Sequence, residues 1–330
     1  MPANPIAPTV DYDADGVQHG FLRLPWSRDE SAWGNLMIPI AVIRNGEGPT
    51  ALLTGASHGD EYEGPVALMD LARTLQPQQV TGRVIIIPYL NYPAFRAGTR
   101  LSPVDGANMN RIFPGRPDGT VSHKIADYLQ CQLLPLADLV LDFHSGGRTL
   151  DFVPFAAAHA LPDREHEARC HAARDAFGAP YSVTMLEIDA VGMLDTAAEE
   201  MGKVFVTTEL GGAGTATARS VGIARRGLRN VLVHAGIVVG EVVNAPSIRL
   251  DMPSIDCFSF SESEGLVEPC VDLGDPVEAG TVLAKVHSAL RTGQEPAEYR
   301  ARMSGILAAR HAPGLIGIGD CLGVVATLLD

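Results

Sequence analysis

The chain has 330 residues, of which 46% are hydrophobic and 19% charged, and its formal net charge is −14. These values are typical of a globular protein with enough apolar material for one large and one small domain. The negative charge argues against nucleic acid and an anionic membrane surface as partners, and no apolar run reaches the roughly 18 residues of a membrane span.

The start of the chain does not indicate secretion, and its cysteines do not indicate a disulfide framework. The segment 1–5 lacks the basic start and the apolar stretch of a signal peptide. The five cysteines are odd in number and scattered, without a Cys-x-x-Cys pair, which predicts reduced thiols and a cytoplasmic location. Residues up to about 33 are rich in proline and aspartate, with a strand candidate at 20–24 that would pair with the apolar segment 36–44.

From residue 51 onward strand and helix patterns alternate, which predicts an α/β fold with a mixed sheet covered by helices on both faces. Strands are expected at 51–55, 84–90, 139–143, 152–157, 181–185 and 204–208. Helices are expected at 65–75, 122–134 (with Ser122 as N-cap), 164–177, 196–201 and 218–238. The segment 96–118 lacks periodicity, and so long a loop in a compact domain is usually functional.

The composition changes near residue 245, which predicts a catalytic domain at 1–245 and a C-terminal β domain at 246–330. Two similar pieces, 271–277 and 315–322, each place a Gly-Asp turn between apolar runs. This doubling predicts a small β-barrel that resembles the barrel of lipoyl and biotinyl carrier domains. The carriers' modified lysine has no counterpart, since Lys285 lies within an apolar run. We expect this domain to pack over the sheet edge and to narrow the entrance to the site.

Polar side chains follow three of the expected strands: His58 and Glu61 after the first, His144 after another, and Glu209 after a third. The carboxyl ends of parallel strands meet at one sheet edge, so these side chains are expected to converge. Two histidines and one carboxylate are the ligands of a hydrolytic zinc site that leaves one position open. Glu209, outside that set, could then act as general base and return the proton to the leaving amine.

Each of these residues has a plainer interpretation when it is taken alone. One His-x-x-Glu spacing is weak evidence for a metal, His144 could be a structural hydrogen bonder, and Glu209 could cap a helix or form an ion pair. Their joint placement at one sheet edge favours the metal site over these alternatives.

The loop 96–118 contributes Arg96, Arg100 and Arg111, with Asn108 and Asn110 beside them. An arginine near a zinc site can polarise a carbonyl, and another can hold a carboxylate through a bidentate fork. For Arg96, a solvated position or an ion pair with the acidic surface is an equally good interpretation.

Six motifs in this order make the chain resemble the succinylglutamate desuccinylase and aspartoacylase family, relatives of the zinc carboxypeptidases, over roughly residues 35 to 330. They are His58-Gly-Asp-Glu61, Asn91-Tyr92-Pro93-Ala94, Gly98-Thr99-Arg100, the segment from Asn108 to Gly115, Asp142-Phe143-His144 and the segment from Thr208 to Gly212. The resemblance implies one Zn²⁺ per chain on His58, Glu61 and His144. It also implies that Glu209 is the acid/base residue, Arg100 polarises the scissile carbonyl, and Asn110 and Arg111 grip the substrate's carboxylate.

Two departures from the family pattern weigh against dicarboxylic substrates such as N-acetylaspartate. Asn108 stands where the family usually has aspartate, and Pro103 and Gly106 lengthen the spacing from Arg100 to Asn110. The run 102–106 is most similar to the ectoine-degradation branch, which removes acetyl from the α-nitrogen of N-acetyl-2,4-diaminobutyrate. That substrate carries an amine in place of a second carboxylate.

The main hypothesis is a zinc-dependent amidohydrolase that removes an acyl group, with acetyl favoured, from a small N-acyl amino acid. The alternatives are another deacylase of the desuccinylase/aspartoacylase type, a metallocarboxypeptidase, and a non-enzymatic binding module built on the β-barrel. The expected partner is the small-molecule substrate, with assembly into a homo-oligomer left open.

Overall fold

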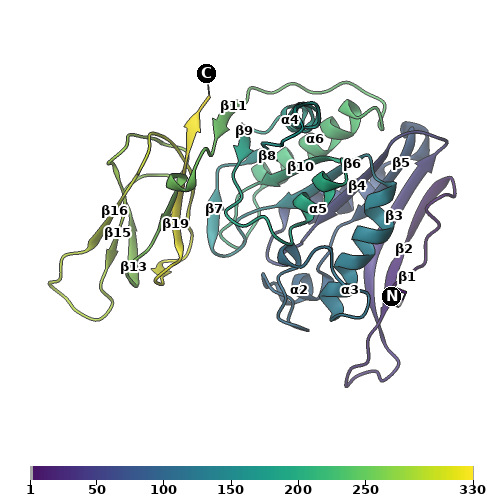
Figure 1. Cartoon of the computed structure of the whole chain (residues 1–330), viewed down its shortest axis with the longest axis horizontal. Coiled ribbons are helices and arrows are strands. Elements are labelled where there is room, and N and C mark those ends of the chain that lie inside the picture. Colours follow the sequence, from purple (N-terminus) through teal and green to yellow (C-terminus); the bar gives the residue numbers. More distant parts are fainter. Residues whose placement is uncertain (1–2, 330) are drawn as a thin grey trace.

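The structure is a computed structural model that describes residues 3–329. A long twisted sheet runs through the molecule, and its centre is the parallel set β5-β4-β6-β10. The expected α/β fold is confirmed, with helices on both faces of the sheet (Figure 1). Within residues 3–329, no helix combines the length and the apolar composition that a membrane crossing requires.

In residues 3–245, which are expected to be catalytic and are called the catalytic part below, antiparallel pairs occur only at the edges of this parallel centre. The edge strands β2 and β3 form an antiparallel pair that joins β5, while β8 runs antiparallel to β10. The bounds are β1 (Ala7–Pro8), β2 (Gly16–Pro25), β3 (Asn35–Asn45), β4 (Thr50–Gly55), β5 (Gly82–Ile87), β6 (Leu139–His144), β8 (Phe155–His159), β9 (Tyr181–Met185) and β10 (Val204–Glu209).

Two apolar cores hold the helices against the two faces of the sheet. One core packs α1, α4 and α6 on one face through side chains such as Leu68, Phe177 and Leu228. The other core packs α3 and α5 on the opposite face through Ile125 and Leu194. The helices are α1 (Glu63–Thr74), α2 (Tyr92–Ala97), α3 (Val121–Tyr128), α4 (Arg164–Phe177), α5 (Leu194–Glu200) and α6 (Ala218–His234).

Several expected boundaries are wrong. Ser122 is not the N-cap of α3: it lies inside the first turn, where its N–H and hydroxyl donate to Asp105 at 2.8 and 2.9 Å. This helix ends at residue 128 and continues as a π-helical turn over Leu129–Leu133. The helix α6 ends at residue 234, before Gly236 in the left-handed region (φ 70°).

The strand expected at 152–157 is also wrong, because the structure divides it in two. Residues 150–152 form β7 (Leu150–Phe152), and β8 begins only after Pro154, which has no N–H for the sheet. The two strands have different partners: β8 pairs with β10, and β7 pairs with β17 (Gly305–His311) of the C-terminal part.

The C-terminal part consists of two small sheets around its own apolar core. One is the four-stranded sheet β16-β15-β13-β18, and the other is the end of the long sheet, where β14, β17, β19 and β12 pair. The strands are β11 (Ile248–Asp251), β12 (Phe258–Phe260), β13 (Gly265–Pro269), β14 (Pro276–Val277), β15 (Val282–His287), β16 (Ala297–Arg300), β17 (Gly305–His311), β18 (Leu315–Ile316) and β19 (Cys321–Leu328).

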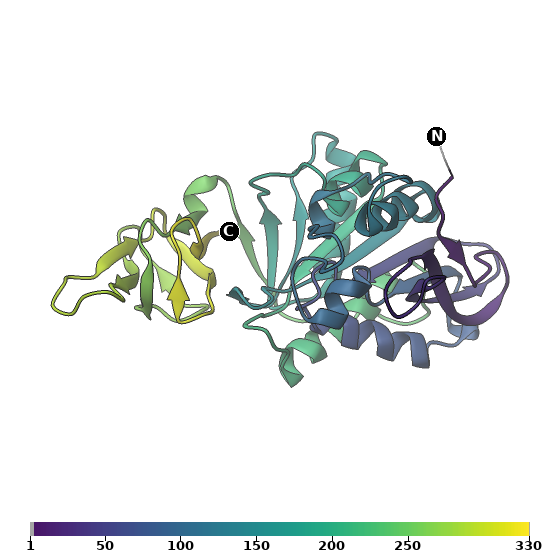
Figure 2. The ribbon, with the colours of Figure 1, turned by 90° about the horizontal axis from the view of Figure 1, so that it is seen from below.

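This C-terminal part lies beside the catalytic part and does not fold over it, as the two views at right angles show (Figures 1 and 2). It is attached through two strand pairings, β9 with β11 and β7 with β17. The boundary expected after residue 245 falls in an irregular segment between α6 and β11. Lys285 lies in the middle of β15, where its Nζ is 3.7 Å from Glu298, and not at the tip of a hairpin.

The turn after β4 depends on a close approach of two backbones, which gives a test of the fold. A Cβ atom at Gly59 would lie 2.0 Å from the carbonyl carbon of Ala94 in α2. We expect Gly59→Ala to lower the free energy of unfolding by about 1–3 kcal/mol or more, because backbone atoms cannot move aside as a side chain can. Denaturant titration measures this change.

Gly222→Ala is the matched control, because a Cβ there meets no atom within 4 Å on α6. It should leave stability unchanged or raise it by about 0.5–1 kcal/mol. Equal stability of the Gly59→Ala variant and the wild type would show that the turn does not lie against α2.

Candidate metal and active site

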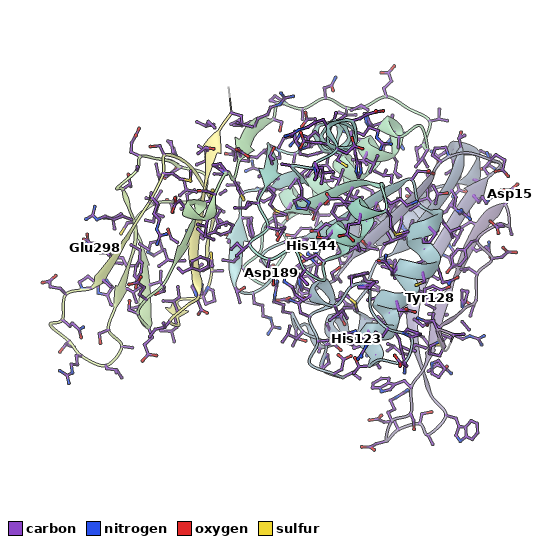
Figure 3. All side chains as sticks on the ribbon, in the orientation of Figure 1. Asp15, His123, Tyr128, His144, Asp189 and Glu298 are labelled. Atoms are coloured by element: carbon purple, nitrogen blue, oxygen red, sulfur yellow. The ribbon has the colours of Figure 1, made fainter. Side chains whose placement is uncertain are left out.

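The carboxyl ends of β4, β6 and β10 bring the expected site residues together. In the parallel register Gly55 lies opposite Phe143, and Glu209 lies opposite His144. His58 and Glu61 follow β4 in a buried turn that begins at Ala56, a residue held in the left-handed region (φ 51°). His144 lies deep in the catalytic part, while Glu298 marks the distant C-terminal sheet (Figure 3).

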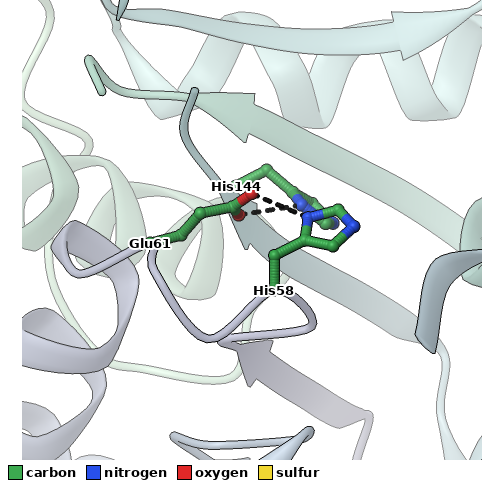
Figure 4. A group of neighbouring side chains, drawn as sticks. All are labelled: His58, Glu61 and His144. Carbon is green, nitrogen blue, oxygen red and sulfur yellow. Dashed lines mark hydrogen bonds and ion pairs between the residues drawn. The ribbon is translucent and has the colours of Figure 1, made fainter. Parts of the chain in front are cut away.

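The Glu61 carboxylate lies between the two imidazole rings and contacts both (Figure 4). Its Oε1 is 2.7 Å from His58 Nδ1, and its Oε2 is 3.1 Å from His144 Nδ1. The Ser145 N–H also donates to Oε2, at 3.2 Å. The three side chains offer two nitrogens and one oxygen within 4.8 Å of one another, a spacing that could hold a metal ion.

In each imidazole, Nδ1 faces Glu61 and is the inner nitrogen, while Nε2 is the outer nitrogen and has an acceptor of its own. His58 Nε2 is 3.1 Å from Asn108 Oδ1, and His144 Nε2 is 2.8 Å from Asp142 Oδ2. The Thr54 hydroxyl in turn donates to Asp142 at 2.6 Å. Such partners fix the proton on the outer nitrogen and leave the inner nitrogen to face a metal, so these residues fit a divalent ion.

Burial and charge set the protonation of these groups. Burial lowers the pKa of His58, against the opposing effect of Glu61. Burial also disfavours the charged form of His144, but Asp142 and Glu61 raise the pKa of His144 well above its usual range. For Glu61, burial would raise the pKa, yet the two histidines hold it far below the ordinary carboxyl range. A metal ion would therefore compete with a proton on His144.

Glu209 ends β10 beside this group, and its environment suits proton transfer. Its Oε2 is buried and finds no hydrogen-bond partner among residues 3–329. Burial, and then the negative charge of Glu61, raise the pKa of Glu209 well above the usual value. A carboxylate with a free oxygen and a raised pKa can accept and return a proton near neutral pH.

The long loop brings Arg100, Asn110 and Arg111 to the same cavity, whereas Asn108 contacts His58 and is not part of the cavity lining. Arg100 Nη1 is 3.7 Å from Glu61 Oε1, and its side chain is 44% exposed. Asn110 is buried and its Oδ1 accepts from the N–H of Leu194 at 2.9 Å, which leaves its amide NH₂ free to donate. Arg111 donates to the Asn110 carbonyl at 2.6 Å. Arg96 lies outside the cavity, and its Nη1 is 3.4 Å from the Tyr92 hydroxyl.

These side chains line a cavity of about 310 Å³, the size of a small-molecule site. Its walls come from residues 58 to 209, and none comes from the described part of the C-terminal segment. The expectation that the β domain narrows the entrance is therefore wrong for a single chain. The reason is topological: β11 pairs with β9 at the sheet edge, so the domain extends the sheet sideways, away from the strand ends.

A second group of ionisable side chains lies in the cavity wall. His159 Nδ1 is 2.9 Å from Glu199 Oε1, while its Nε2 is 3.8 Å from Glu187 and 4.0 Å from Asp195. We call these four residues the His159 cluster. Glu187 and Asp195 face the cavity that holds Glu209 and Arg111.

Sequence reasoning missed Asp142 and most of the His159 cluster. Asp142 could have been found, because residues two apart in a strand share a face, which places it beside His144. The cluster had no such signal, because its members come from β8, a loop and α5.

Comparisons with known proteins agree with one another. The model of the succinylglutamate desuccinylase/aspartoacylase catalytic domain matches residues 47–235. The N-alpha-acetyl-L-2,4-diaminobutyric acid deacetylase of Halomonas elongata is 55% identical, covering 99% of this chain and 96% of that protein.

Solved structures are similar over the same extent. The product-bound structure of the ectoine utilization protein EutE (DoeB) from Ruegeria pomeroyi has a TM-score of 0.98 at 64% identity, covering 99% of this chain and 100% of that one. A succinylglutamate desuccinylase/aspartoacylase from Rhodobacter sphaeroides has a TM-score of 0.94 at 40% identity, covering 98% and 100%.

The role of Asp142 as the support of His144 can be tested. Asp142→Asn keeps the size of the side chain but removes the charge beside His144 Nε2. We expect about a 10–100-fold loss of metal affinity, with His144→Ala losing more, because supporting carboxylates orient metal ligands. Competition against a chelator, with Zn²⁺ as the probe ion, measures the affinity.

Asp138→Asn is the control. Asp138 comes just before β6, at the end of that strand away from Asp142, and accepts a hydrogen bond from the Thr50 N–H. It should bind the probe ion like the wild type. Full affinity in the His144→Ala variant would show that His144 is not a ligand.

Proposed function

The chain belongs to the succinylglutamate desuccinylase/aspartoacylase family and is a deacylase of that type, and we propose that its substrate is N-α-acetyl-L-2,4-diaminobutyrate. The observation that carries the proposal is the His58–Glu61–His144 group with the free oxygen of Glu209 in the same cavity. The deacetylase named above, similar along the whole chain, supports the choice of substrate.

We assign one Zn²⁺ per chain to His58, Glu61 and His144, because two nitrogens and one oxygen with an open position suit that ion. When bound, zinc would polarise the acyl carbonyl and lower the pKa of the attacking water. Glu61 and the two histidines would hold it, and Asn108 and Asp142 would keep the two rings in place.

Side chains of the protein carry out proton transfer, stabilise the developing charge and bind the substrate's carboxylate. Glu209 takes the proton of the attacking water and delivers it to the nitrogen of the departing amine. Arg100, at the mouth of the cavity, faces the developing negative charge on the acyl oxygen. The Asn110 amide and the Arg111 guanidinium hold the α-carboxylate of the amino acid.

The alternatives fit the cavity less well. A carboxypeptidase needs an open groove for a peptide, whereas about 310 Å³ suits a single small amino acid derivative. A binding module built on the C-terminal β domain would leave the buried site without a role. The two-domain division at residue 245, the cytoplasmic location and any homo-oligomer stay predictions.

A substrate panel tests the proposal directly. We expect release of acetate from N-α-acetyl-L-2,4-diaminobutyrate, and much slower cleavage of N-acetylaspartate, N-succinylglutamate and a C-terminal peptide bond. Dialysis against a chelator should abolish the activity, and Zn²⁺ should restore it. Full activity of the metal-free protein would refute the zinc assignment, and a preference for the peptide would favour the carboxypeptidase.

Glu209→Gln tests the proton transfer. The amide has nearly the same size, so the fold and the metal should remain, but it cannot accept a proton from water. We expect kcat to fall by about 10²–10⁴-fold or more, with little change in KM. Steady-state kinetics and the metal content of the purified variant give the two measurements.

Loss of the metal in this variant would instead make Glu209 a ligand. If the variant kept both its metal and its rate, Glu209 would not be the general base, and Glu187 in the same cavity would be the next candidate. Glu63 is not a candidate, since it lies outside the cavity and its Oε1 accepts from the Ser220 hydroxyl at 3.1 Å.

A further inference from the structure

The His159 cluster lies against the residues assigned to the substrate's carboxylate. Leu194, whose N–H donates to Asn110 Oδ1, immediately precedes Asp195 at the start of α5. Asp195 and Glu187 line the same cavity as Asn110 and Arg111. A molecule held by its carboxylate at Asn110 would have this acidic wall beside it.

The cluster carries more negative than positive charge. It contains three carboxylates and a single imidazole, and in the described part of the chain neither Asp195 nor Glu187 has a lysine or arginine within 4 Å. Asp195 is 4% exposed, and among residues 3–329 only its Oδ1 accepts hydrogen bonds, from the N–H and hydroxyl of Thr196. His159 Nε2 is buried, and no side chain or backbone group in the described part of the chain forms a hydrogen bond with it.

Buried carboxylates are costly unless a cation faces them, so this wall is built for a positively charged group. We propose that Asp195 and Glu187 bind the side-chain ammonium of the substrate, and that they select amino acids with a short cationic side chain. The proposal rests on the proposed function, which supplies a substrate with a γ-ammonium. An ammonium brings several N–H donors, and charge-assisted hydrogen bonds are about twice as strong as neutral ones.

Three of these residues, His159, Glu187 and Asp195, could hold a metal ion by spacing alone, but the state of His159 opposes this. Burial disfavours its charged form, yet the carboxylates of Glu187 and Glu199 raise the pKa of His159 to about 10. An imidazolium has no free lone pair for a metal. It can instead hold the carboxylates in place from behind, so that their other side faces the cavity.

The protonation of Asp195 also suits an incoming cation. Burial raises the pKa of Asp195 to about 6, against the opposing effect of His159. The charged carboxylate is therefore only moderately favoured in the empty cavity, and a bound ammonium would stabilise it. A substrate with an acidic side chain would meet the opposite situation, since two carboxylates would face a third.

Kinetics with a matched pair of substrates tests this assignment. N-acetyl-L-norvaline has the size of N-α-acetyl-L-2,4-diaminobutyrate but carries a methyl group in place of the ammonium. The wild type should prefer the ammonium substrate in kcat/KM. In Asp195→Asn the ratio of the two kcat/KM values should fall by about 10–10²-fold, the effect of one charge-assisted hydrogen bond, mainly through a higher KM for the ammonium substrate.

Glu187→Gln is the second variant, and it guards against misfolding, because Glu187 lies on a loop and accepts no hydrogen bond among residues 3–329. It should lower the same ratio. Glu200→Gln is the matched control, an acid-to-amide change at an exposed position of the same helix as Asp195. It should keep the wild-type ratio.

The outcomes separate the two proposals. If the wild type cleaves neither substrate, the proposed function fails. If it cleaves the ammonium substrate and both variants keep the wild-type ratio, the assignment of Asp195 and Glu187 is overturned while the function stands. A second equivalent of metal in the wild type that is lost in Asp195→Asn would also overturn the assignment, in favour of a metal site.

Discussion

The shared Glu61 carboxylate is the interaction on which the arrangement of the site depends. Each of its oxygens contacts an imidazole from a different strand end, so the turn after β4 and the end of β6 are fixed relative to each other. Asn108 and Asp142 hold the same rings from outside, and Thr54 holds Asp142. A loop, two strands and a turn thus meet at one buried pair of histidines, and movement of any of them would change the spacing of His58, Glu61 and His144.

Much of this site could be predicted from the sequence, because its residues follow the ends of parallel strands. Apolar runs that end in polar residues identify strand ends, and parallel neighbours bring such ends to one edge. His58, Glu61, His144 and Glu209 follow this rule. The helices α1 and α4 were equally predictable, since each has an apolar face of helical period over most of its length.

What could not be predicted depends on contacts between distant segments. The partner of Ser122 is Asp105, which comes from an irregular loop, so the local pattern suggested a cap that the structure does not use. The position of the β domain depends on which edge strand β11 joins, and composition does not specify that choice. The His159 cluster is the clearest case, because its residues have no spacing in common.

The two attachments of the C-terminal part have a mechanical consequence. β11 continues the sheet from β9, and β17 covers the free side of β7, whose Leu150 and Phe152 line the cavity. The C-terminal part is therefore attached at two separate sheet edges. A hinge motion of this part about a single linker would break the hydrogen bonds of one of the two strand pairs. A protein shortened to its catalytic part would leave the edges of β9 and β7 without partners. Exposed strand edges of this kind promote association between chains, so the C-terminal part protects the solubility of the catalytic part as well as the shape of its cavity wall.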